Sequence, residues 1–141
     1  MQQCNAVHLA GVRVALRHDL QLSLIRLGAG GSFRNGTPHV PDGAGGAFVI
    51  VENVDVGARW TPSTTWLGFQ INAAYPAADV YPHYVGVLSR VDGRSLGDAI
   101  SATTWQGRPA LQLSRRSNGW NPAVDTAANK AERILRWLAD R

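Results

Sequence analysis

The sequence has a single cysteine, Cys4, among its 141 residues. One thiol can form neither an internal disulfide nor a thiolate metal cluster, so both of these stabilising devices are excluded. The histidines do not supply a metal site either, because His8, His18 and His39 lie far apart and lack the short spacing of a metal-binding motif. We therefore expect no bound metal.

Long apolar runs are also missing. No stretch approaches the roughly 18 apolar residues of a membrane helix, and the charged residues Arg13, Arg17 and Asp19 within the N-terminal apolar part argue against a signal peptide. Charged residues make up only 17% of the chain, with a net charge of +4 and scattered arginines. This mild excess is weak evidence for nucleic acid and is compatible with an acidic protein partner. We expect a cytoplasmic protein that has neither a membrane nor a nucleic acid as its partner.

The composition that remains is that of a globular protein. Hydrophobic residues make up 45% of the chain, and this length is sufficient for one domain with its own core. We therefore treat residues 1–141 as a single domain.

The N-terminal third contains three predicted segments. Apolar spacing favours a short helix at residues 6–19, although Gly11 and the β-branched valines leave a strand as the alternative over part of it. Alternation favours a strand at 20–27 (LQLSLIRL). Residues 29–46 are rich in Gly, Pro and Asn, which predicts a flexible loop. The glycines of this loop match neither GxxxxGK[ST] nor a strand–GxGxxG–helix arrangement, so we expect no nucleotide cofactor.

The middle of the chain has the alternating pattern of an antiparallel sheet. Residues 47–54 (AFVIVENV) and 64–72 (TTWLGFQIN) predict two strands joined by a long hairpin loop, and residues 84–88 predict another. With residues 20–27 these form a four-stranded meander. Residues 98–102 are expected to form a helical turn, and TTWQG a bend before a short apolar–polar strand at 109–114.

The C-terminal segment predicts a long helix. Asn121 suits the N-cap and Pro122 the first helical position, where a missing N–H costs nothing. An apolar stripe with helical spacing follows. Its members are Val124, Ala127, Ala128, Ala131, Ile134, Leu135 and Leu138. The element order predicts an α+β domain.

Four stretches together resemble the ubiquitin-conjugating-enzyme fold. GFQINAAYPAADVYP is similar to the strand and Tyr-Pro turn of that fold, and WNPAVDTAANKAERILRWL to its Trp-x-Pro-Ala and following helix. Together with GGAFVIVENVDVG and GRPALQLSRRSNGW, they resemble a bacterial branch that is encoded beside ubiquitin-like proteins and activating-enzyme homologues. The resemblance covers residues 47–138. It implies a fold with an N-terminal helix, the four-stranded meander and a helix after the Trp-x-Pro turn, and it implies those two proteins as partners.

The chain departs from this family at the catalytic position. The family's cysteine lies on the segment before the tryptophan, and the corresponding residue here is Gln112. The His-Pro-Asn motif of the eukaryotic members is absent as well. Thioester chemistry at the usual position is therefore excluded.

The first hypothesis is that a hydroxyl replaces the thiol. Ser114 would carry the C-terminal carbonyl of a ubiquitin-like protein as an oxyester and pass it to an acceptor amine. A hydroxyl requires a base and oxyanion donors to act as a nucleophile. The candidates are His83 as base, Asn118 as oxyanion donor, and Arg115 and Arg116 as sources of positive charge.

The second hypothesis is a non-catalytic adaptor. Arg115 and Arg116 would then face an acidic ubiquitin-like protein or activating-enzyme homologue, and Trp120 would cover the segment before it. An unrelated hydrolase is the weakest alternative, because the chain has no GxSxG motif and no recognisable triad order.

Overall fold

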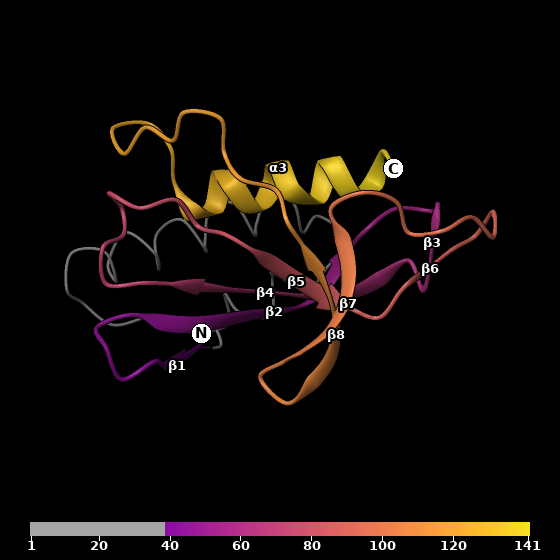
Figure 1. The fold of residues 1–141 in the computed structure, drawn as a ribbon, viewed down its shortest axis with the longest axis horizontal. Coiled ribbons are helices and arrows are strands. Elements are labelled where there is room, and N and C mark those ends of the chain that lie inside the picture. Colours follow the sequence, from indigo (N-terminus) through magenta and orange to yellow (C-terminus); the bar gives the residue numbers. More distant parts are fainter. Residues whose placement is uncertain (1–38) are drawn as a thin grey trace.

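The computed structural model describes residues 39–141. The predicted helix at 6–19, the predicted strand at 20–27 and most of the predicted loop at 29–46 lie outside this range. Within the described part the protein is α+β, with an antiparallel sheet and a C-terminal helix (Figure 1).

One six-stranded sheet forms the centre of the described part. Its strand order is β1-β2-β4-β5-β8-β7, and every neighbouring pair is antiparallel. A separate pair of short strands, β3 and β6, lies beside it. The strands are β1 (His39–Pro41), β2 (Ala47–Asp55), β3 (Trp60–Thr61), β4 (Thr64–Ile71), β5 (His83–Gly86), β6 (Ser89–Arg90), β7 (Ile100–Trp105) and β8 (Arg108–Leu113).

The predicted strands at 47–54, 64–72 and 109–114 are confirmed by β2, β4 and β8, and the one at 84–88 overlaps β5. Three expectations are wrong. The sheet has more than four strands. Residues 100–105 form the strand β7, so the helical turn expected at 98–102 is absent and the bend expected over TTWQG is confined to its last two residues. The chain reverses after Trp105 at Gln106 and Gly107, both with positive φ. Residues 39–41 of the predicted loop pair with β2 as β1.

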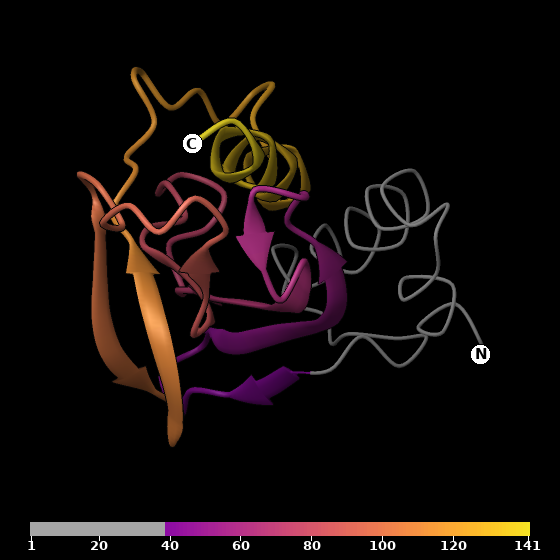
Figure 2. The ribbon, with the colours of Figure 1, turned by 90° about the vertical axis from the view of Figure 1, so that its right-hand side faces the viewer.

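The helix α3 (Ala127–Ala139) packs against one face of the sheet (Figure 2). Its stripe from Ala127 to Leu138 is buried as predicted, but its start is not where we expected it. Thr126 is the N-cap, and its hydroxyl accepts a hydrogen bond from Asn129 N at 3.0 Å. Asn121 instead begins a separate turn, and Val124 is 65% exposed. Two acceptable N-caps lie close together in the sequence, and the structure uses the second.

The opposite face of the sheet carries an aromatic cluster around Trp105. Its ring stacks on those of Tyr84 and Trp66, with centroids 4.9 Å and 5.9 Å away. A Cβ placed on Gly68 would lie 2.3 Å from the Trp105 ring, so only glycine lets the indole lie on the strand. The β7–β8 hairpin is thereby held against the sheet. In residues 39–141 no helix is long and apolar enough to cross a membrane.

Candidate functional site

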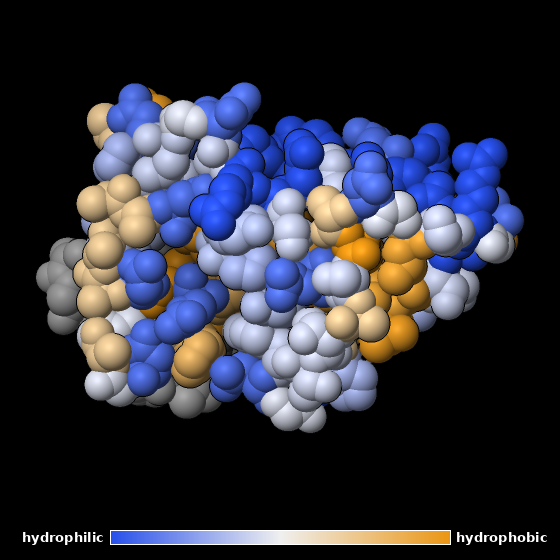
Figure 3. Space-filling view, viewed as in Figure 1, coloured by the Kyte–Doolittle hydropathy of each residue, from blue (hydrophilic) through white to orange (hydrophobic). Residues whose placement is uncertain are grey.

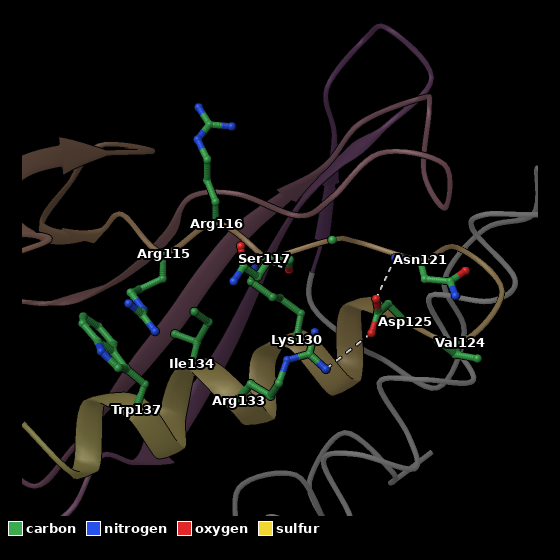
Figure 4. Close-up of a pocket in the computed structure, with 12 residues that line it drawn as sticks. Arg115, Arg116, Ser117, Asn121, Val124, Asp125, Lys130, Arg133, Ile134 and Trp137 are labelled. Carbon is green, nitrogen blue, oxygen red and sulfur yellow. Dashed lines mark hydrogen bonds and ion pairs between the residues drawn. The ribbon is translucent and has the colours of Figure 1, made fainter.

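A hollow in the surface lies between the segment that follows β8 and helix α3. Its volume is about 720 Å³, and it is a region where polar side chains converge (Figure 4). We call it the basic pocket. One side is formed by residues 115–119 and Asn121, and α3 contributes Lys130, Arg133, Ile134 and Trp137. Val124 and Asp125 complete the lining. The space-filling view shows hydrophilic residues predominating along this side of the molecule (Figure 3).

A buried ion pair holds the two sides of the pocket together. The ammonium of Lys130, whose side chain is 3% exposed, donates to both carboxylate oxygens of Asp79 at 2.9 Å and 3.1 Å. It also donates to Ser117 Oγ at 2.9 Å and to Val80 O at 3.1 Å. Ser117 in turn donates its backbone N–H and its hydroxyl to Asp79. The loop, α3 and the segment before β5 therefore meet at one polar point.

This cluster has the composition of a Ser–Lys nucleophile but not its charge state. Partial burial alone would raise the pKa of Asp79, but the hydrogen bonds from Lys130 and Ser117 outweigh it and keep the pKa below its ordinary value. The carboxylate is therefore ionised at neutral pH. Burial lowers the pKa of Lys130, and the hydrogen bonds and the negative charge of Asp79 oppose this shift and stabilise the ammonium form. A charged ammonium cannot accept the proton of a serine hydroxyl. The role of the cluster is to position the loop.

Three guanidinium groups surround the pocket. Arg115 lies over the Trp137 ring, 5.0 Å from its centroid, and its side chain points toward α3 (Figure 4). Arg133 reaches Asp125 at 3.5 Å, with about half of its side chain exposed. Arg116 turns away from α3 and stacks on Tyr81 at 4.1 Å. Stacking on an aromatic ring orients a guanidinium and leaves its N–H edge free to bind an anion.

The loop itself is shaped by the turn that begins at Asn121. The side chain of Asn121 accepts from Ala123 N at 3.0 Å, and its carbonyl accepts from Val124 N and Asp125 N. The backbone N–H of Asn121 in turn donates to the carboxylate of Asp125 at 2.7 Å. This closed turn places Asp125 beside Arg133. Asn121 of the Trp-x-Pro segment thus lines the pocket, and the segment does not form the first turn of α3.

The structure brings together some of the predicted site residues. Arg115, Arg116 and Asn118 all line the basic pocket. Ser114 lies just before them at the end of β8, where its backbone N–H donates to Ala99 O at 2.8 Å. Its hydroxyl accepts a bond from Gln112 Nε2 at 3.1 Å.

Two other predicted site residues, Trp120 and His83, make contacts within the fold and do not line the pocket. Trp120 is partly buried against the core, and its indole N–H donates to Pro76 O at 2.8 Å. His83 lies on β5 with no exposed surface and contacts the Phe69 ring. Neither nitrogen of His83 has a hydrogen-bond partner among the described residues, so it does not pair with Ser114. Burial, with a smaller contribution from Lys130, lowers the pKa of His83 to about 3, which makes its imidazole a weak base.

Sequence reasoning missed Asp79, Ser117 and Lys130. The position of Lys130 could have been noticed in the sequence, because this lysine lies on the apolar stripe of the helix, between Ala127 and Ile134. A lysine in such a position must be buried with a partner or must bend out to water. Asp79 carried no comparable signal, since it lies in an irregular segment 51 residues away.

No protein-family model, curated protein or solved structure matches this chain. In residues 39–141 no three His, Cys, Asp or Glu side chains gather as metal ligands would.

Proposed function

We propose that this chain is a ubiquitin-conjugating-like domain that acts as a docking module in a bacterial ubiquitin-like-protein pathway. In this proposal the basic pocket binds an acidic surface segment of a ubiquitin-like protein or of an activating-enzyme homologue. The observation that carries it is a hollow that Arg115 and Arg133 line beside α3, with Arg116 at its outer margin, and whose two sides are linked by the Lys130–Asp79 pair. The family assignment rests on the sequence resemblance, together with the antiparallel sheet of residues 39–141 and the helix α3 on its face.

The docking role is favoured over an acyl carrier because no group among residues 39–141 is placed to activate Ser114. Its hydroxyl contacts the neutral amide of Gln112, and the predicted base His83 makes no hydrogen bond to it. An unactivated hydroxyl is a poor nucleophile at neutral pH. The positively charged side chains beside it need no activation to bind an acidic partner.

The test uses the whole chain together with the ubiquitin-like protein and activating-enzyme homologue of its pathway. Binding is measured by calorimetry for the wild type, for Arg133→Glu and for the matched control Arg136→Glu. Arg136 is also exposed on α3 but does not line the pocket. We expect Arg133→Glu to weaken binding at least roughly ten-fold, because like charges oppose docking, and Arg136→Glu to change it by less than about three-fold.

A second measurement separates docking from catalysis. After incubation with ATP, intact-mass spectrometry should show no covalent adduct on the chain. A thiol-resistant, hydroxylamine-sensitive adduct that is absent from Ser114→Ala would overturn the docking proposal and establish Ser114 as an acyl carrier. Equal loss of affinity in the Arg133 and Arg136 variants would overturn the assignment of the pocket.

A further inference from the structure

The outer edge of β7 is open within residues 39–141. β7 is the last strand in the order and pairs only with β8 (Figure 2). Along a strand of an antiparallel pair, successive residues direct their backbone N–H and C=O groups alternately toward the paired strand and away from it. The Ser114 N–H bond to Ala99 O and the register Ser101↔Gln112 show that Ala99, Ser101 and Thr103 face β8. The N–H and C=O groups of Ile100, Ala102 and Thr104 therefore face outward.

This edge lacks the usual protection against strand pairing. Residues 101–104 (Ser-Ala-Thr-Thr) are all exposed and carry neither charge nor proline. Proteins commonly block open edges with lysine, proline or a bulge. The opposite edge of the sheet, by contrast, ends in the three-residue strand β1, which contains Pro41. An uncharged edge of small polar residues is suited to β-strand addition by an extended segment.

Direction and charge define the segment that would fit. A strand added antiparallel to β7 runs in the same direction as β8, so its C-terminus arrives beside Ile100. Arg141 lies beside the segment that leads into β7, because a Cβ on Gly97, three residues before Ile100, would be 3.4 Å from one of its guanidinium nitrogens. Arg115 comes from the same end of β8, and both guanidinium groups lie over the Trp137 ring, at 5.0 Å and 5.1 Å.

We propose that β7 binds the extended C-terminal tail of a partner protein as an added antiparallel strand, with the terminal carboxylate received by Arg141 and Arg115. If the proposed function holds, the partner is the ubiquitin-like protein, and the inference specifies which part of it is bound. A second copy of this chain fits less well, because like charges would meet. In an antiparallel β7–β7 pair the hairpin end of one copy, which carries Arg108, would lie beside the end of the other copy that Arg141 approaches.

The direct test uses a fluorescein-labelled peptide, Ser-Val-Thr-Val-Ser-Val-Gly-Gly, with a free C-terminal carboxylate. Fluorescence anisotropy gives its affinity, and ¹⁵N NMR of the whole chain gives its position. We expect amide shifts concentrated at Ile100, Ala102 and Thr104. Amidating the C-terminus should weaken binding about ten-fold, the loss of a charge-assisted contact. Arg141→Ala should weaken the free-acid peptide to the same extent and leave the amidated peptide unchanged.

Protein and peptide variants test the strand pairing separately. Ala102→Pro removes an outward N–H without touching the β8 bonds, so it should abolish binding, whereas the control Ala102→Val should retain it. If Ala102→Pro unfolds the chain, N-methylation of alternate peptide nitrogens gives the same information. Methylation of the nitrogens that face β7 should abolish binding, and methylation of the others should not.

The outcomes separate this inference from the proposed function. Peptide shifts away from β7, or equal binding of the acid and the amide in wild type, would overturn the inference. If the folded partner still binds in an Arg133-dependent manner in that case, the proposed function stands. If the peptide binds β7 as described while Arg133→Glu has no effect on the folded partner, the inference stands and the pocket assignment fails.

Discussion

Replacement of His83 by leucine should remove a specific acid sensitivity from the protein. His83 has no exposed surface and no hydrogen-bond partner in the described part of the chain, so its charged form is strongly disfavoured in the folded state. Its pKa falls from 6.5 to about 3. The unfolded chain therefore binds more protons than the folded chain between these values, and acid favours unfolding. The stability associated with neutral His83 is present above pH 6.5 and is lost as the pH falls toward 3.

The size of this effect follows from the two pKa values. Each pH unit below 6.5 costs about 1.4 kcal/mol. Between pH 7.0 and pH 4.5 the wild type should therefore lose about 2.5 kcal/mol of unfolding free energy through His83 alone. Leucine has a side-chain volume similar to that of histidine and cannot titrate. The His83→Leu variant should therefore not show this loss of unfolding free energy. At pH 7.0 it should be more stable than the wild type by about 1–3 kcal/mol, because two buried unpaired nitrogens are removed.

The assay is urea unfolding followed by tryptophan fluorescence at both pH values. Tyr84→Leu is the matched control, because Tyr84 is the next residue on β5 and belongs to the opposite face. Its stability should fall at both pH values through lost stacking on Trp105, but with the wild-type pH dependence. Carboxylate titration contributes equally to all three proteins and cancels. If His83→Leu and the wild type lose the same free energy between pH 7.0 and 4.5, the buried, neutral state of His83 is refuted.

Three further substitutions test the supports of the pocket and the sheet by urea unfolding. Asp79→Ala leaves the buried Lys130 ammonium without its carboxylate partner and should lower the free energy of unfolding by about 3–5 kcal/mol. A decrease below about 1 kcal/mol would contradict the buried pair. Gly68→Ala forces a methyl group into the Trp105 ring and should cost about 1–3 kcal/mol, with a reduced near-UV circular dichroism signal; an unchanged signal would contradict the contact. Thr126→Ala removes the N-cap of α3 and should cost about 1 kcal/mol, and no change would show that the helix begins elsewhere.

The regular elements were largely predictable because their patterns are local. The alternation in residues 47–54 and 64–72 and the helical stripe from Ala127 to Leu138 each specify an element without long-range information. The clearest exception is β7. Residues 98–102 (Asp-Ala-Ile-Ser-Ala) have no clear alternation, since the middle of β7 is exposed on both faces and only Ile100 and Trp105 are buried. Pairing with β8 through a two-residue turn determines this strand, and the periodicity of its own residues does not.

The site was predictable only in part. The basic turn at Arg115 and Arg116 stands out in the sequence because two charges follow a strand, and the structure places both at the pocket. The pairing of Lys130 with Asp79 could not be read from the chain, because the contact depends on how the irregular segment before β5 passes over α3. The burial of His83 was equally hidden, since a histidine within a strand can face either side of a sheet.

The Lys130 contacts also determine how a partner meets this surface. They link residues that are 13 and about 50 positions apart in the chain, so the loop cannot swing outward without releasing the helix and the segment before β5 as well. The hollow consequently exists before any partner arrives, and little conformational freedom is lost when one binds. In stopped-flow mixing, association should follow a single phase whose rate rises linearly with partner concentration, without the plateau that a slow rearrangement of the loop would impose.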